Sequence, residues 1–149
     1  FLIIGIVYER HHTRMVKYYG GLVHTMPLYT FIFLFFTMSN IGLPGTGSFV
    51  GEFLILAGSF KTNTSATFIS ATGMIIGGCY SLWLFNRISY GNVKIQYLKD
   101  YIDINKREMF IFLPLILGTI TIGLYPEIFL NSIHMSVNML VEITHIYNL

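Results

Sequence analysis

Charged residues are scarce in this sequence. Only 11% of its 149 residues are Asp, Glu, Lys or Arg, whereas 54% are hydrophobic. A soluble domain carries about twice that proportion of charge. The charged residues are also clumped, so that none occurs in 18–51, 62–86 or 109–126. Each of these gaps meets or approaches the ~20 apolar residues that a membrane helix needs. The sequence therefore excludes an ordinary soluble domain and predicts an integral membrane protein.

Cysteine and net charge are equally scarce. The single cysteine, Cys79, lies inside an apolar stretch, which excludes a disulfide framework or a cysteine-based metal cluster. The net charge of +2 is too small and too scattered to indicate nucleic-acid binding. No arrangement of cysteine or histidine is typical of a flavin or iron–sulfur site, so we expect no cofactor in this chain.

Four apolar segments emerge between the charged stretches. They cover about 1–8, 27–60, 66–86 and 109–130, and a more polar tail follows over 131–149. The first would reach only ~12 Å as a helix, so it is interpreted as the end of a helix that begins elsewhere. The tail is expected to lie along the membrane surface. The predicted fold class is all-α integral membrane, with the end of one transmembrane helix and three more.

The segment 27–60 is too long for one membrane span. A continuous helix of that length would reach ~50 Å, well beyond a hydrocarbon core of ~30 Å. A break is therefore expected, and the stretch "LPGTG" favours one because proline removes a backbone donor and glycine lets the chain change direction. The predicted break comprises Leu43, Pro44, Gly45, Thr46 and Gly47.

Glu52 follows this break on the same apolar segment, ~12 Å further along the helix. Broken membrane helices tend to line ion or substrate pathways, because lipid does not tolerate unpaired backbone. An ionised carboxylate in the membrane is costly, so Glu52 must be neutral, paired or hydrated. We expect it to act as a proton relay. The alternative is a structural glutamate that is hydrogen-bonded to a neighbouring helix.

Other features of the sequence predict contacts rather than chemistry. Gly47 and Gly51, like Gly73 and Gly77, have the G-x-x-x-G spacing that favours close packing of helices. The mixed-sign stretch "DINKRE" at 103–108 is interpreted as part of a solvated surface loop.

The basic residues predict an orientation in the membrane. Loops 9–26 and 87–108 emerge on the same side and carry eight of the nine Lys and Arg residues, whereas the loop at 61–65 carries only Lys61. The positive-inside rule assigns the basic side to the cytoplasm or the mitochondrial matrix.

Six stretches then occur in a familiar order. They are "YERHHTR", "YYGGLVHTMP", "NIGLPGTGSFVGEFLIL", "SLWLFNRISYG", "DINKREMFIFLPL" and "GLYP". Together they resemble the C-terminal part of the subunit 4 family of NADH dehydrogenase (ubiquinone), an antiporter-like membrane subunit of respiratory complex I. The resemblance runs over about residues 1–130.

The resemblance implies a role for Glu52. It would lie on the broken twelfth of fourteen transmembrane helices, at the position where this family carries the ionisable residue of the proton exit path. The family's other key charged groups would lie upstream of residue 1. Either a separate chain carries the N-terminal helices (a split subunit), which we favour, or the sequence is a piece of a longer subunit. Partners would be that separate chain, other complex I membrane subunits and lipids. FMN, iron–sulfur clusters and ubiquinone would be bound elsewhere in the complex.

The resemblance also implies a location in the mitochondrial inner membrane, with loops 9–26 and 87–108 facing the matrix. A composition rich in Ile, Phe and Tyr and poor in Ala, typical of A/T-rich codons, agrees with an organelle genome. Two alternatives stay open. The chain could belong to a multi-subunit cation/proton antiporter or a membrane-bound hydrogenase, or it could be a purely structural membrane scaffold.

Overall fold

The computed structural model describes residues 1–94 and 102–147, and seven α-helices and one short 3-10 helix lie in this part of the chain. They are α1 (Leu2–His11), η1 (Val16–Tyr18), α2 (Leu22–Thr25), α3 (Pro27–Asn40), α4 (Gly47–Thr62), α5 (Thr64–Ser89), α6 (Lys106–Leu124) and α7 (Glu127–Tyr147). The predicted all-α fold class is confirmed.

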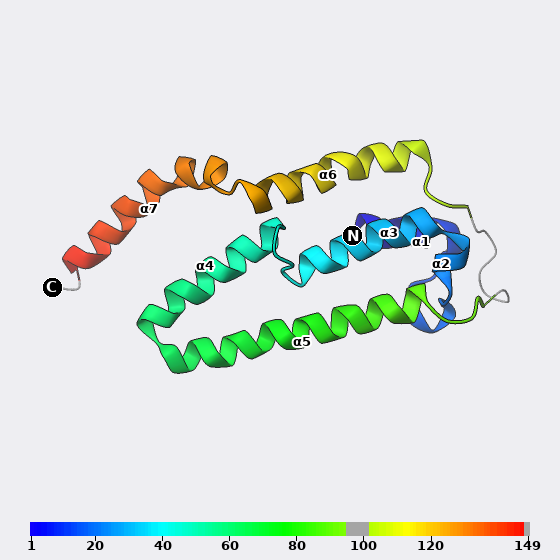
Figure 1. The fold of residues 1–149 in the computed structure, drawn as a ribbon, viewed down its shortest axis with the longest axis horizontal. Coiled ribbons are helices and arrows are strands. Elements are labelled where there is room, and N and C mark those ends of the chain that lie inside the picture. Colours follow the sequence, from blue (N-terminus) through cyan, green and yellow to red (C-terminus); the bar gives the residue numbers. More distant parts are fainter. Residues whose placement is uncertain (95–101, 148–149) are drawn as a thin grey trace.

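The helices lie along one long axis (Figure 1). Helices α3 and α4 follow one another along this axis, and the connection at 41–46 separates them. Helix α5 returns alongside both, and α6 contacts α4. The segment that we expected over 27–60 is therefore two shorter helices joined at a break.

Helices α5 and α6 are long and apolar enough to cross a membrane. Helix α5 is longer than the expected 66–86, because Asn63 accepts a hydrogen bond from the Ala66 N–H (3.2 Å) and caps the helix at its start. Most of the large apolar side chains of α5 and α6 are exposed. Exposed apolar faces are typical of helices that contact lipid or other protein. The chain is a membrane protein.

The helix that we expected over 109–130 instead ends at Leu124, and α7 starts at Glu127. Proline has no N–H and disfavours helical backbone in the residue before it, so Tyr125 and Pro126 separate the two helices. The tail is thus helical from Glu127, and in Figure 1 it projects away from the other helices.

The buried core gathers at the end of the molecule where α1, α2, α3, the end of α5 and the start of α6 meet. Its members are Ile6, Val7, Tyr19, Leu22, Met26, Tyr29, Ile32, Phe33, Phe85 and Phe112. Leu22 and Met26 are fully buried, and the rings of Phe33 and Phe85 lie 5.3 Å apart. This packing holds α3 against α5. It therefore also positions the break at the C-terminal end of α3.

Candidate functional site at the helix break

Helix α3 ends in a hydrogen-bonded turn before the proline. Gly42 has left-handed backbone geometry (φ 82°), and its N–H donates to the Ser39 carbonyl at 3.1 Å. The Leu43 N–H donates to the Met38 carbonyl, also at 3.1 Å. These two bonds form a Schellman motif, in which a left-handed glycine lets the last carbonyls of a helix find donors. The helix therefore stops at Gly42, and Pro44 keeps it from resuming there.

The connection between the two helices is closed by Thr46. The Leu43 carbonyl accepts hydrogen bonds from the Thr46 N–H (3.1 Å) and from its Oγ1 (2.7 Å), and Thr46 is buried. Gly45 has a φ of 95°, and α4 begins at Gly47. The first four predicted break residues thus lie in the connection and the fifth starts α4. Sequence reasoning missed Gly42, although a glycine just before a proline-containing turn is a helix-end signal.

The end of α6 packs tightly against the break. A Cβ at Gly123 would overlap the backbone of Gly45, and a Cβ at Gly47 would lie 2.9 Å from Cγ2 of Ile122. Close approach of the two segments therefore requires glycine. Gly51, the other member of the expected packing pair, does not take part, because a Cβ there would meet nothing within 4 Å.

The carboxylate of Glu52 lies at the break itself. Helical side chains point back toward the N-terminus of their helix, and Glu52 reaches from the second turn of α4 to Gly42. A Cβ at Gly42 would overlap Oε2 of Glu52 and would lie 3.2 Å from its Cδ. The expected ~12 Å separation along the helix therefore does not hold for the carboxylate. Oε2 is buried and has no hydrogen-bond partner within the described residues.

A cavity of about 380 Å³ adjoins this carboxylate. It is lined by Asn40, Ile41, Glu52, Ser70, Gly73, Met74, Gly77, Gly78 and Tyr80. Gly73 and Gly77, which were expected to pack closely against a helix, instead form part of its wall. A buried carboxyl oxygen without a protein partner finds its hydrogen bonds in water or in groups outside the described residues. The arrangement is thus suited to a group that exchanges protons with water.

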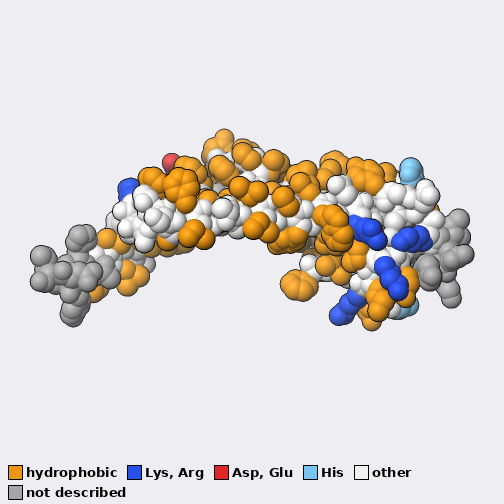
Figure 2. Space-filling model, turned by 90° about the horizontal axis from the view of Figure 1, so that it is seen from below, with side chains coloured by type: hydrophobic (Ala, Val, Ile, Leu, Met, Phe, Trp, Pro, Cys, Tyr) orange, Lys and Arg blue, Asp and Glu red, His pale blue; other side chains and the backbone are white. Residues whose placement is uncertain are grey.

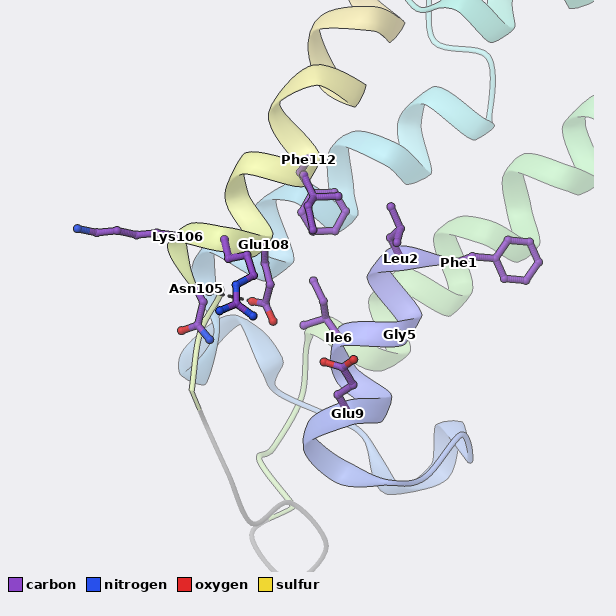
Figure 3. A pocket seen from close by; sticks show the side chains of 11 residues that line it. Phe1, Leu2, Gly5, Ile6, Glu9, Asn105, Lys106, Glu108 and Phe112 are labelled. Atoms are coloured by element: carbon purple, nitrogen blue, oxygen red, sulfur yellow. Dashed lines mark hydrogen bonds between the residues drawn. The ribbon is translucent and has the colours of Figure 1, made fainter.

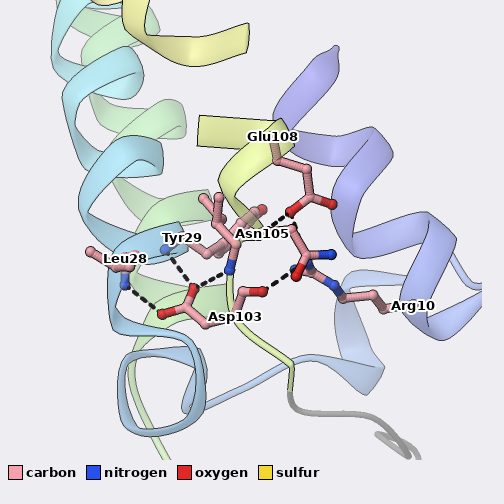
Figure 4. Close-up of polar contacts among 7 residues, drawn as sticks. Arg10, Leu28, Tyr29, Asp103, Asn105 and Glu108 are labelled. Atoms are coloured by element: carbon pink, nitrogen blue, oxygen red, sulfur yellow. Dashed lines mark hydrogen bonds and ion pairs between the residues drawn. The ribbon is translucent and has the colours of Figure 1, made fainter. Parts of the chain in front are cut away.

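A second polar cluster, which sequence reasoning missed, lies at the other end of α3 (Figure 4). The Asp103 carboxylate accepts hydrogen bonds from the N–H groups of Leu28 (3.0 Å) and Tyr29 (3.1 Å) in the first turn of α3. Arg10 donates to the Asp103 carbonyl at 3.0 Å and forms an ion pair with Glu108 at 2.8 Å. The Arg10 and Glu108 side chains are only 11% and 19% exposed. The expectation of a solvated surface holds for Asn105, Lys106 and Arg107, which are exposed. It does not hold for the two acids of this stretch, whose carboxylates accept hydrogen bonds from backbone N–H groups and from Arg10.

An open cavity of about 800 Å³ lies between α1 and the start of α6, beside this cluster (Figure 3). Phe1, Leu2, Ile6 and Phe112 form much of its apolar wall, while Glu9 lines it nearer the loops. Its walls come only from these two helices, so it is a groove on the surface of this chain rather than an enclosed site.

Metal-binding groups are not assembled in the part of the chain that the structure describes. Within residues 1–94 and 102–147, no group of three or more His, Cys, Asp or Glu side chains could hold a metal ion. Cys79 is exposed on α5.

The family model for NADH:quinone oxidoreductase/Mrp antiporter transmembrane proteins matches residues 1–78 of this chain. The matched residues include the break, Glu52 and most of the residues that line its cavity. The match covers just over half of the chain, so the features described above lie within the part that the family shares.

Three known relatives extend this match over nearly the whole chain. NADH-ubiquinone oxidoreductase chain 4 is 55% identical in Marchantia polymorpha and 52% in Arabidopsis thaliana, in each case over 95% of this chain. NADH-quinone oxidoreductase subunit M of Rhodobacter capsulatus is 46% identical over 97%. The matched region spans only 28–29% of each relative's length. The chain belongs to the NADH:quinone oxidoreductase/Mrp antiporter transmembrane family and is a homologue of NADH-ubiquinone oxidoreductase chain 4.

Proposed function

We propose that this chain is part of a proton-translocating membrane subunit of NADH:ubiquinone oxidoreductase, in which Glu52 relays protons. The observation that carries the proposal is the buried, unpartnered Oε2 of Glu52 beside a cavity at a helix break. The names of the relatives, chain 4 and subunit M, favour this enzyme over a cation/proton antiporter or a membrane-bound hydrogenase.

The chemistry of a carboxyl group in this setting supports a relay. Ionised Glu52 would lack the hydrogen bonds that normally stabilise a buried carboxylate, so both protonation states depend on water in the cavity. The break supplies room for that water, since the chain leaves helical geometry only where protein or water surrounds the backbone. Glu52 can therefore take up a proton from one side and release it to the other without any redox group in this chain.

Partners and cofactors follow from the same proposal. FMN, iron–sulfur clusters and ubiquinone would be bound by other parts of the complex, which would drive proton release by quinone reduction. The chain would assemble with other membrane subunits, with lipids, and with the part of subunit 4 that it does not cover, whether that part lies on a separate chain or on the same one.

The proposed location is the mitochondrial inner membrane. The basic loops 9–26 and 87–108 would face the matrix, and the turn between α4 and α5 would face the intermembrane space. Six of the first seven relatives are named as ubiquinone-linked chain 4, which supports the mitochondrial rather than the bacterial form.

Replacement of Glu52 by glutamine tests the proposal. Glu52→Gln keeps the shape of the side chain and removes its charge, so the complex should assemble while the number of protons translocated per NADH oxidised falls. The measurement is proton uptake by vesicles that contain the purified complex. Glu142→Gln on the exposed face of α7 is the matched control and should change neither quantity. An unchanged proton yield in Glu52→Gln would leave only the structural-scaffold function.

A further inference from the structure

We propose that the C-terminal end of α5 binds an anionic phospholipid. The phosphate of the lipid lies in a pocket between Arg87 and Lys94, and an acyl chain runs from there along the exposed face of α5. This inference goes beyond the proposed function, because it assigns a second site to the chain and does not depend on Glu52.

Two loops are locked together at this end of the molecule and form the floor of the pocket. The Gly21 N–H donates to the Tyr90 carbonyl at 3.1 Å. Gly21 has a left-handed backbone (φ 69°), and a Cβ there would lie 2.7 Å from the carbonyl oxygen of Gly91. A Cβ at Gly20 would lie 3.0 Å from the carbonyl oxygen of Asn92. The loop before α2 therefore packs directly on the backbone of the loop that follows α5, and the floor is preformed.

The pocket over this floor is basic. It has a volume of about 460 Å³, and its lining includes Arg87 from the last turn of α5 and Lys94 from the loop. Among the residues that the structure describes, no Asp or Glu lines it, and the ion pair of Arg10 with Glu108 involves neither cation. The Lys94 ammonium donates to the Lys17 carbonyl, which uses one of its three N–H groups and holds it in place. Within the described residues, both cations therefore keep donors for an anion.

Exposed aromatic rings lie beside the two cations. The Arg87 guanidinium lies 6.0 Å from the centre of the Trp83 ring, which is a cation–π contact. Trp83 and Tyr90 are both exposed and both line the pocket. Tryptophan and tyrosine rings gather where a membrane helix crosses the headgroup level, because each ring has an apolar body and a polar edge. The pocket therefore lies at the level of the lipid headgroups.

An apolar stripe leads from this pocket into the membrane. Ile76, Tyr80 and Trp83 precede Arg87 at intervals of three or four residues, so the four side chains align along one side of α5. Ile76, Tyr80 and Trp83 are 64%, 62% and 62% exposed, on a helix that is long and apolar enough to cross a membrane. The stripe offers an acyl chain a continuous apolar surface that ends at two cations.

The combination of pocket and stripe favours an anionic phospholipid over other ligands. A soluble phosphate pairs with the two cations but makes no use of the stripe. A phosphatidylcholine molecule fits the stripe, but its headgroup has no net charge. Basic pockets at the ends of membrane helices are typical sites for anionic headgroups. Lys and Arg side chains also gather at this end of the molecule (Figure 2), and their summed field attracts an anion.

Photolabelling of the whole complex tests the site. The purified complex is placed in phosphatidylcholine vesicles that contain a phosphatidylglycerol with a photoreactive acyl chain, and the labelled peptides are mapped by mass spectrometry. We expect label on α5 between Ile76 and Trp83. Added unlabelled phosphatidylglycerol should remove this label, whereas the same amount of added phosphatidylcholine should not. Absence of label from this stretch, equal loss with phosphatidylcholine, or loss with inorganic phosphate alone would overturn the proposal.

Removal of the two charges is the second test. Arg87→Gln with Lys94→Gln keeps hydrogen-bond donors and removes both charges. We expect the phosphatidylglycerol concentration that halves the labelling to rise roughly 30-fold, because each cation near an anionic headgroup contributes about a factor of five to six. Arg87→Lys, which keeps the charge, should bind like the unmodified complex.

Lys106→Gln with Arg107→Gln is the matched control. It removes the same charge from exposed positions at the start of α6, outside the pocket, and should leave the half-labelling concentration unchanged. If the variant at Arg87 and Lys94 also leaves it unchanged, these cations do not hold the lipid and the proposal is wrong.

The apolar stripe has its own test. Trp83→Ala should also raise the half-labelling concentration, whereas Phe68→Ala, which removes another exposed ring near the opposite end of α5, should not. An equal effect of the two substitutions would contradict binding along the stripe. None of these measurements uses the proton yield. A failure of Glu52→Gln to lower that yield would therefore overturn the relay and leave the lipid site standing, and a failure of the labelling would do the reverse.

Discussion

At the residue scale, Gly42 combines two roles at the break. Its left-handed backbone lets α3 end, and its missing side chain leaves space for the Glu52 carboxylate. Other L-residues pay about 1–2 kcal/mol for this backbone geometry. The ionisable group and the turn that positions it are therefore parts of one structural unit, and a change at Gly42 acts on both.

Gly42→Ala should lower both the melting temperature of the assembled complex and its proton yield, because the new methyl group displaces the Glu52 carboxylate. Gly45→Ala isolates the backbone term, since Gly45 also has positive φ but a Cβ there would meet nothing within 4 Å. We expect Gly45→Ala to lower the free energy of unfolding by roughly 1–2 kcal/mol, and so to lower the melting temperature about as much as Gly42→Ala does. The proton yield of the intact Gly45→Ala complex should be unchanged. Equal proton yields in the two variants would contradict a contact between Gly42 and Glu52.

At the scale of the helices, α3 is held at both ends by residues from elsewhere in the chain. Asp103 caps its N-terminus, where unpaired N–H groups and the positive end of the helix dipole favour a carboxylate. Arg10 joins the same cluster to α1 and, through Glu108, to α6. The position of the break relative to α5 and α6 thus depends on contacts made at the opposite end of α3.

Asp103→Ala should destabilise the assembled complex by about 1 kcal/mol, the usual cost of losing a helix cap, because Leu28 and Tyr29 lose their acceptor. The melting temperature of the purified complex measures this effect. Asp103→Asn retains an acceptor oxygen and should lose less. A result in which both variants melt like the unmodified complex would show that the cap contributes nothing to stability.

At the scale of the whole molecule, large apolar side chains are exposed on every long helix. Figure 2 shows them over the greater part of one face, with Lys and Arg gathered at the end that holds the buried core. Such a continuous apolar surface is stable only against lipid or against other membrane helices. Figure 3 shows the groove beside α1, whose lining residues come from α1 and the start of α6.

The proposed function predicts that the chain assembles into a large complex. On a native gel of solubilised membranes stained for NADH dehydrogenase activity, we expect this polypeptide in a very large active band. Intact mass of the subunits in that band would then distinguish a separate chain of 17.0 kDa from a longer polypeptide that contains these residues. Recovery only from a small, inactive assembly would contradict the proposed membership of the enzyme and favour the antiporter alternative.

The amino-acid sequence by itself determined the membrane environment, the helical class and the need for a break within 27–60. These features depend on the composition of the apolar segments and on their length. The length of a membrane helix must match the thickness of the hydrocarbon core, whatever the helix packs against. The identity of Glu52 as the ionisable group beyond the break was equally visible, because it is the only charged residue between Lys17 and Lys61.

Only the tertiary structure decided what these residues contact. It set the carboxylate of Glu52 against Gly42. The side chain points back toward the start of α4, so its carboxylate lies nearer the break than the position of Glu52 in the sequence suggests. It joined Asp103 to Leu28, which lie 75 positions apart, and Thr67 to Ser59 across two helices. Polar groups pair with whatever donor the packed helices bring within reach, and that neighbour is set by docking of the helices rather than by spacing in the sequence.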